Sequence, residues 1–124
     1  MPRDFSRTRR VGEQIQRELA SLIRDEVRDP RVGSVTVSEV RVTRDLAHAE
    51  VLVTGLGLDA AASAEMVEAL NHAAGFLRGL LGRQLHLRTV PALRFRYDES
   101  FERGARLSRL IDEAVEEDEE KHRD

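Results

Sequence analysis

Apolar and charged positions in the first thirty residues alternate with the period of an amphipathic helix. Apolar side chains recur every three or four residues, at Val11, Ile15, Leu19, Leu22, Ile23 and Val27. This spacing gathers them in one stripe along a helix. Pro30 ends the segment, because the residue before a proline avoids the helical conformation. The pattern therefore predicts a helix from about Ser6 to Val27, with Ser6 as its N-cap.

The next segment shows the two-residue period of β-strands. In the first predicted strand the apolar positions are Val35, Val37, Val40 and Val42. Their alternation changes phase after Val37, and a β-bulge near Ser38-Glu39 would account for the slip. In the second predicted strand the alternating positions are Ala49, Val51 and Val53. The short link Thr43–Leu46 predicts that the two strands form a hairpin.

Two consecutive helical patterns follow, and a glycine stands between them. The apolar positions of the first are Met66, Val67, Leu70, Ala73 and Ala74. Those of the second, all expected to be core positions, are Phe76, Leu77, Leu80, Leu81 and Leu85. A glycine inside a helix costs about 1 kcal/mol relative to alanine. Gly75 therefore predicts a kink, or a close approach to a neighbouring segment.

A third strand is predicted from Ala92 to Tyr97, where apolar or aromatic residues alternate with arginines. Alternation turns Leu93, Phe95 and Tyr97 toward the helices. The same alternation turns the arginines between them to the open face of the sheet.

A last helix is predicted from about Gly104 to Val115, and the charged end of the chain follows it. The apolar face of this helix consists of Leu107, Leu110, Ile111, Ala114 and Val115. Residues 116–124 offer no apolar side chain to bury, so they should be disordered. The order of the elements predicts an α+β domain, a three-stranded sheet with helices on one face. We predict one domain over residues 1–115 and an acidic tail over residues 116–124.

The net charge of −3 conceals a segregation of charge. From Asp112 to Asp124 there are eight acidic and two basic residues, a net of −6, whereas residues 1–111 carry a net of +3. One basic cluster contains no acid between its members, which are Arg78, Arg83, Arg88, Arg94 and Arg96. A second cluster lies near the N-terminus and consists of Arg3, Arg7, Arg9 and Arg10. Basic clusters on a compact body favour a polyanion as the partner.

Both clusters are candidates for RNA contact, because arginine neutralises phosphates and stacks on unpaired bases. The alternative for each arginine is a solvated position beside an acidic side chain. For the N-terminal cluster, a flexible arm that touches RNA and a solubilising terminus are both open.

Candidates for catalytic or metal-binding residues are lacking. The chain has no cysteine, which excludes disulfides, thiolate catalysis and cysteine-type zinc sites. Its four histidines are scattered, and neither a P-loop nor a dinucleotide fingerprint occurs. We therefore predict a monomer without enzyme activity, metal or cofactor. No apolar run approaches the roughly 20 residues that cross a bilayer. Since no secretory signal is visible at the N-terminus, we expect a cytoplasmic protein.

The order of elements, with a helical pair broken at small residues, resembles a type II KH domain. KH domains clamp single-stranded nucleic acid. Several segments narrow the resemblance to the ribosome-binding factor A family, namely Asp29–Gly33, Arg44–Val51, Ala73–Arg78, Leu87–Phe95 and Tyr97–Ser100. The resemblance covers roughly residues 6–115.

This resemblance implies binding to small-subunit ribosomal RNA during late maturation of the subunit. It also implies a role in ribosomal RNA processing and cold adaptation, and no bound cofactor. In the family an Ala-x-Gly kink, here Ala73-Ala74-Gly75, replaces the Gly-x-x-Gly loop of other KH domains. The chain also contains a literal Gly79-Leu80-Leu81-Gly82. Because its leucines lie on the periodic apolar face, we interpret this segment as part of a core helix.

Two other classes of function stay open at this stage. One is a protein-interaction module whose basic face binds an acidic protein, which would lack salt-sensitive RNA binding. The other is an enzyme such as a small nuclease, which would need a positioned base or a cluster of metal-binding carboxylates. Outside the acidic tail the acids are dispersed, so this class ranks last.

Overall fold

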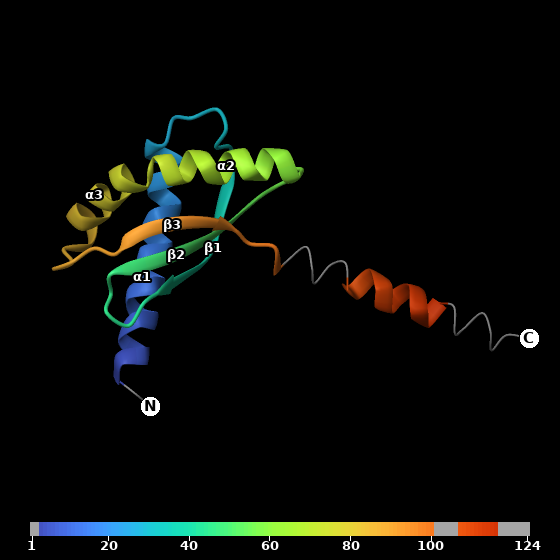
Figure 1. Ribbon diagram of the computed structural model, residues 1–124, viewed down its shortest axis with the longest axis horizontal. Coiled ribbons are helices and arrows are strands. Elements are labelled where there is room, and N and C mark those ends of the chain that lie inside the picture. Colours follow the sequence, from blue (N-terminus) through green and yellow to red (C-terminus); the bar gives the residue numbers. More distant parts are fainter. Residues whose placement is uncertain (1–2, 101–106, 117–124) are drawn as a thin grey trace, which may run out of the picture.

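The computed structural model describes residues 3–100 and 107–116, and its elements follow the order predicted from the sequence (Figure 1). They are α1 (Arg3–Glu26), β1 (Val35–Val42), β2 (His48–Gly55), α2 (Ala60–His72), α3 (Ala74–Leu85) and β3 (Ala92–Tyr97). The predicted α+β class, with the element order of a type II KH domain, is confirmed.

Helix α1 buries the predicted stripe, including Ile15 and Leu19, which are fully buried. It approaches β1 very closely at Gly12, where a Cβ atom would lie 2.7 Å from the carbonyl oxygen of Val40. The helix begins at Arg3, three residues before the predicted N-cap. The N-terminal arginines therefore belong to the first turns of a helix, and the flexible arm considered for them is wrong.

The three strands form a mixed sheet in the order β1-β2-β3. Strand β2 pairs with β1 in antiparallel and with β3 in parallel orientation. The register of β1 shifts between Val37 and Glu39, so Ser38 has no partner across the ladder. This shift is the predicted bulge. It allows Val40 and Val42 to pack against the same core as Val37.

Helices α2 and α3 connect the two parallel strands. The carboxylate of Asp59 caps α2, because its Oδ1 accepts a hydrogen bond of 2.7 Å from the N–H of Ala62. Ala73 separates the two helices, with φ −87° and ψ 0°, and offers no side-chain cap to α3. The kink thus falls within the predicted triplet. Leu81 is fully buried in α3, which confirms that Gly79–Gly82 is part of a core helix.

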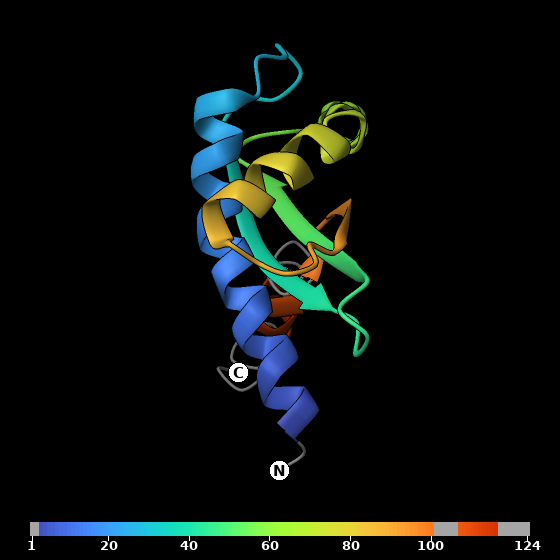
Figure 2. The ribbon, with the colours of Figure 1, turned by 90° about the vertical axis from the view of Figure 1, so that its left-hand side faces the viewer.

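The core lies between the inner face of the sheet and the helices. Its largest fully buried side chains include Phe95, Met66, Leu70 and Leu77. Figure 2 shows α1 running lengthwise beside the sheet, with α3 crossing at an angle to it. As predicted, Arg94 and the other arginine of β3 are exposed, on the face opposite the buried Leu93 and Phe95.

Residues 107–116 form a further helix, drawn apart from the sheet in Figure 1. The predicted start at Gly104 lies outside the described residues, as does the predicted tail after residue 116. All ten residues of this helix are exposed. Its apolar side chains therefore do not contribute to the core.

Candidate nucleic-acid interface

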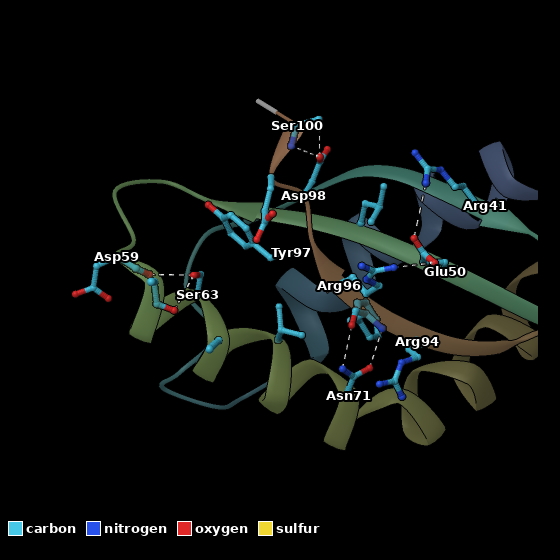
Figure 3. Close-up of a pocket in the computed structure, with 16 residues that line it drawn as sticks. Arg41, Glu50, Asp59, Ser63, Asn71, Arg94, Arg96, Tyr97, Asp98 and Ser100 are labelled. Atoms are coloured by element: carbon cyan, nitrogen blue, oxygen red, sulfur yellow. Dashed lines mark hydrogen bonds and ion pairs between the residues drawn. The ribbon is translucent and has the colours of Figure 1, made fainter. Parts of the chain in front are cut away.

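A groove of about 700 Å³ lies between α2 and β3 (Figure 3). Asn71 of α2 bridges to the strand, since its Nδ2 donates to the carbonyl oxygen of Phe95 at 3.0 Å. Its Oδ1 accepts from the N–H of Phe95 at 2.7 Å. Strand β3 is an edge strand, and the N–H groups of Ala92 and Asp98 point to the β2 side. The alternate groups, including those of Phe95, point to α2, and Asn71 covers this edge.

The charges that line the groove are divided between its two ends. Arg41, Arg94 and Arg96 lie at one end together with Glu50, whereas Asp59 and Asp98 lie toward the other (Figure 3). A nucleic-acid strand carries negative charge along its whole length. Such a strand would therefore be disfavoured at the end that Asp59 and Asp98 form.

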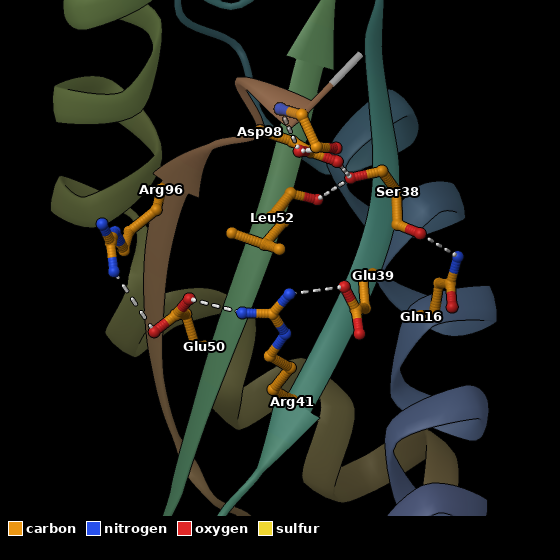
Figure 4. A network of polar contacts seen from close by, with 9 residues as sticks. Gln16, Ser38, Glu39, Arg41, Glu50, Leu52, Arg96 and Asp98 are labelled. Atoms are coloured by element: carbon orange, nitrogen blue, oxygen red, sulfur yellow. Dashed lines mark hydrogen bonds and ion pairs between the residues drawn. The ribbon is translucent and has the colours of Figure 1, made fainter. Parts of the chain in front are cut away.

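Arg96 belongs to an ion-pair network on the open face of the sheet (Figure 4). Its Nη1 lies 3.6 Å from Glu50, and the same carboxylate lies 3.8 Å from Arg41. Nη2 of Arg41 donates a 3.1 Å hydrogen bond to Glu39, and this bond is the main cause that raises the pKa of Arg41. The charge of Arg96 is thus balanced within the sheet.

Asp98 connects the end of β3 to the bulge of β1. Its carboxylate accepts hydrogen bonds from the Ser100 hydroxyl at 2.5 Å, the Ser38 hydroxyl at 2.6 Å and the Ser100 N–H at 2.9 Å. These bonds, the one from the Ser100 side chain first, lower the pKa of Asp98. On the other side of the bulge, Gln16 Nε2 donates to the carbonyl oxygens of Val37 and Ser38. The acidic end of the groove therefore has a structural role.

The exposed side chain of Arg78, a predicted RNA contact, forms hydrogen bonds within the domain. Its Nε and Nη2 donate to the carbonyl oxygen of Val90 at 3.0 and 2.8 Å. This pair of bonds holds the loop before β3 against α3. Arg78 therefore shapes the neighbouring surface, whatever else it contacts.

The side chains of three arginines in the same cluster have no hydrogen bond or ion pair with any described residue, namely those of Arg83, Arg88 and Arg94. All three are exposed. Arg83 lies in the last turn of α3, Arg88 in the loop after it, and Arg94 on the open face of the sheet. Of the five arginines in this cluster, only Arg94 and Arg96 line the groove. The five arginines thus do not converge on it.

The N-terminal arginines lie on turns of α1 that extend past the sheet (Figure 1). Arg7, Arg9 and Arg10 are exposed. Nε of Arg9 lies 3.5 Å from Glu13, while Arg7 and Arg10 have no ion pair within the described chain. Arg3 is the first residue of the helix. Arg7, Arg9 and Arg10 do not line the groove.

The kink exposes two residues whose roles differ from the sequence-based expectation. A Cβ atom at Gly75 would meet no atom within 4 Å, so packing within the domain does not require glycine there. Phe76 is 54% exposed, and its predicted core position is wrong. Leu77 and Leu81 form the buried side of α3. Phe76 comes one residue before Leu77, so its side chain points about 100° away from that of Leu77.

Comparison with known proteins decides the family. A family model described as ribosome-binding factor A matches residues 7–111. The chain belongs to the ribosome-binding factor A family. One member, from Alkalilimnicola ehrlichii, is 68% identical over 124 residues, which cover 100% of this chain and 95% of that protein.

Solved structures of ribosome-binding factor A share the fold. The crystal structure of the protein from Thermus thermophilus superposes with a TM-score of 0.62 and 29% identity, over 73% of this chain and 94% of that one. A homology model of a Thermus thermophilus ribosome-binding factor A was fitted into the cryo-EM map of a 30S complex. It gives a TM-score of 0.59 and 30% identity, over 71% of this chain and 91% of that one.

The family is one of ribosome-binding factors and not a class of enzymes. Within residues 3–100 and 107–116, no three His, Asp or Glu side chains are grouped so that they could hold a metal ion. The described helices include none that is long and apolar enough to cross a membrane.

Proposed function

We propose that this chain is an assembly factor that binds the small ribosomal subunit through its ribosomal RNA. The observation that carries the proposal is the family match over residues 7–111, together with a relative of the same fold that was fitted into the map of a 30S complex. The unpaired arginines support it, because a polyanion supplies the counter-charge that the described residues do not.

Individual arginines have different roles in this proposal. Arg83, Arg88 and Arg94 contact phosphates, since their guanidinium groups are exposed and unpaired among the described residues. Arg78 and Arg96 act indirectly, one by holding the loop before β3 and the other through its ion pair with a glutamate. The N-terminal cluster, consisting of Arg3, Arg7, Arg9 and Arg10, makes a second contact with RNA. The kink Ala73-Ala74-Gly75 lies against the same RNA strand, as the family resemblance implies.

The proposal extends to the cellular role that family membership suggests. The chain acts in the cytoplasm, as a monomer and without catalytic turnover, late in maturation of the small subunit. It supports processing of ribosomal RNA and adaptation to cold. Loss of the chain from its host would then slow growth more at low than at high temperature, with accumulation of unprocessed small-subunit RNA.

The direct test is co-sedimentation with purified small subunits, large subunits and mature ribosomes at several salt concentrations. We expect binding to free small subunits only. The double variant Arg83→Glu/Arg88→Glu should bind more weakly, and each lost phosphate contact should reduce the salt slope by about 0.7 for a single strand.

The matched control is Arg24→Glu/Arg28→Glu, which makes the same charge change at exposed positions around the end of α1. It should bind as the unmodified chain does. Equal binding of all three proteins at every salt concentration would exclude Arg83 and Arg88 as RNA contacts. Absence of binding by the unmodified chain would refute the proposed function itself.

A further inference from the structure

The exposed side of α3 carries an aromatic and a cationic side chain in line. Phe76 is 54% exposed, and Arg83 is exposed without a partner among the described residues. Residues seven apart lie on the same side of a helix, two turns from each other. The two side chains therefore face the same solvent region, about 10 Å apart along the axis.

The position of Phe76 differs from that of the other described aromatic side chains. Phe95 is 1% exposed in the core, and Tyr97 is partly buried beside the groove. Single exposed apolar residues are common on proteins and do not by themselves indicate a partner. The charge on this side of the helix is the distinguishing feature, because Arg83 shares it with Phe76 and α3 contains no acid. Arg78, two residues after Phe76, points away and donates to the carbonyl oxygen of Val90.

Two glycines near Phe76 in α3 have open space around them. Cβ atoms at Gly75 and Gly79 would meet nothing within 4 Å, whereas one at Gly82 would lie 3.2 Å from Val90. Gly79, three residues after Phe76, lies on the same side of α3, and Gly75 directly precedes Phe76 in the chain. A flat ligand that contacts the exposed part of the ring would therefore find open space at both glycines.

We propose that Phe76 is a stacking platform for an unpaired base of single-stranded RNA, and that Arg83 contacts the phosphate backbone of the same strand. Cationic surroundings select a nucleic acid over an apolar protein segment as the occupant, because every nucleotide brings a phosphate as well as a π-face. The inference rests on the proposed function, and it adds a base-binding site that lies outside the groove.

Tryptophan fluorescence offers a direct test, because the chain contains no tryptophan. Phe76→Trp places a single indole at the proposed site. Leu56→Trp places one at a residue that is 95% exposed in the loop before α2 and serves as the control. Titration with a single-stranded oligoadenylate should quench the indole at position 76 and leave the one at position 56 almost unchanged. Equal quenching at both positions, or none at position 76 while the RNA is bound, would overturn the proposal.

Substitutions at position 76 separate stacking from apolar contact. Phe76→Tyr should retain affinity for the oligoadenylate and for small subunits. For Phe76→Leu and Phe76→Ala, the affinity for both ligands should fall about 5- to 150-fold, the range that corresponds to the loss of one stacked base contact. Because the side chain is outside the core, circular dichroism should show all three variants folded.

The outcomes distinguish this inference from the function on which it rests. If Phe76→Leu keeps its affinity for small subunits and Phe76→Ala loses it, position 76 makes an apolar contact with a protein, and the stacking site is overturned. Unchanged subunit binding across the series would also overturn it, while the proposed function would stand. Failure of the unmodified chain to bind small subunits would remove both.

Discussion

The carboxamide of Asn71 forms two hydrogen bonds with the backbone of Phe95, one as donor and one as acceptor. A side chain of α2 thereby occupies the place that a fourth strand would take beside β3. The pairing fixes α2 along the strand edge and sets the width of the groove. The side chain of Phe95 is buried in the core. This one residue therefore contacts α2 through its backbone and the core through its side chain.

Replacing Asn71 by Leu should destabilise the domain by about 2 kcal/mol, because two partly buried backbone groups of Phe95 lose their partners. Urea denaturation monitored by circular dichroism would measure the change. His72→Ala, at the exposed neighbouring position, should stay within about 0.5 kcal/mol of the unmodified chain. Similar stability of the two variants would show that the bridge contributes little.

Two glycines in helices should respond in opposite directions to alanine. Gly12→Ala would bring a Cβ to 2.7 Å from the Val40 carbonyl oxygen, so α1 must move away from β1. We expect a loss of about 1–3 kcal/mol, as for other overpacked sites. Gly75→Ala meets no atom and should gain up to about 1 kcal/mol, because alanine favours the helix.

Thermal denaturation of the two variants and the unmodified chain would test this contrast. Gly75→Val, which adds β-branching, should still fold, since space is open around the residue. Its effect would then appear in subunit binding. A misfolded Gly75→Val protein would show that the kink depends on glycine in a way that the contacts do not reveal.

The stability of the domain should depend on pH through Asp98. Its pKa is lowered in the folded state from the ordinary value of 3.8, so folding is favoured where the carboxylate is ionised. This contribution is fully present above the ordinary pKa and is lost as the pH falls through the lowered pKa. Ser100→Ala should raise the pKa of Asp98 toward its ordinary value, since the largest cause of the shift is removed.

A carboxyl NMR titration would measure that pKa, and urea denaturation at pH 7 and pH 3 would measure the linked stability. Ser34→Ala serves as the control, because Ser34 is exposed and makes no hydrogen bond with the described residues. Identical titration of Asp98 in both serine variants would contradict the assigned cause.

Removal of residues 107–124 should leave the melting temperature nearly unchanged. All ten described residues of this segment are exposed, so truncation after Arg106 removes no part of the core. We propose that the independently folding unit ends before this helix, short of the boundary at residue 115 that the hydrophobic pattern predicts. Differential scanning calorimetry of the truncated chain would decide, and a drop of more than a few degrees would place the helix in the folded unit.

The sequence predicts features that follow from local periodicity and misses those that depend on partners distant in the chain. The bulge at Ser38 is predicted because a two-residue period cannot change phase without an extra residue. The predicted core position of Phe76 is wrong because this residue adjoins Leu77 in an apolar run. Periodicity alone does not decide which of the two side chains points inward. The bond from Arg78 to the Val90 carbonyl leaves no signal, since any residue at position 90 offers that oxygen.

Asn71 is missed for a related reason. A polar residue near the end of a predicted helix is expected to face solvent, and its two hydrogen bonds depend on where β3 lies. One feature of the sequence could have indicated a role for Phe76, namely that it directly follows the Ala-x-Gly kink that the family resemblance implies. The sequence alone does not show that the ring of Phe76 is exposed beside this kink.

The parallel pairing of β2 with β3 has a consequence for the order of folding. A short turn joins β1 to β2, so closing that hairpin restricts few residues, whereas β3 can pair only after the whole α2–α3 segment has been brought into place. We therefore expect the groove between α2 and β3 to be the last part of the domain to assemble. During synthesis the arginines of α1 emerge first, and an intact groove exists only once Ser100, the last residue that lines it, has left the ribosome that is making the chain.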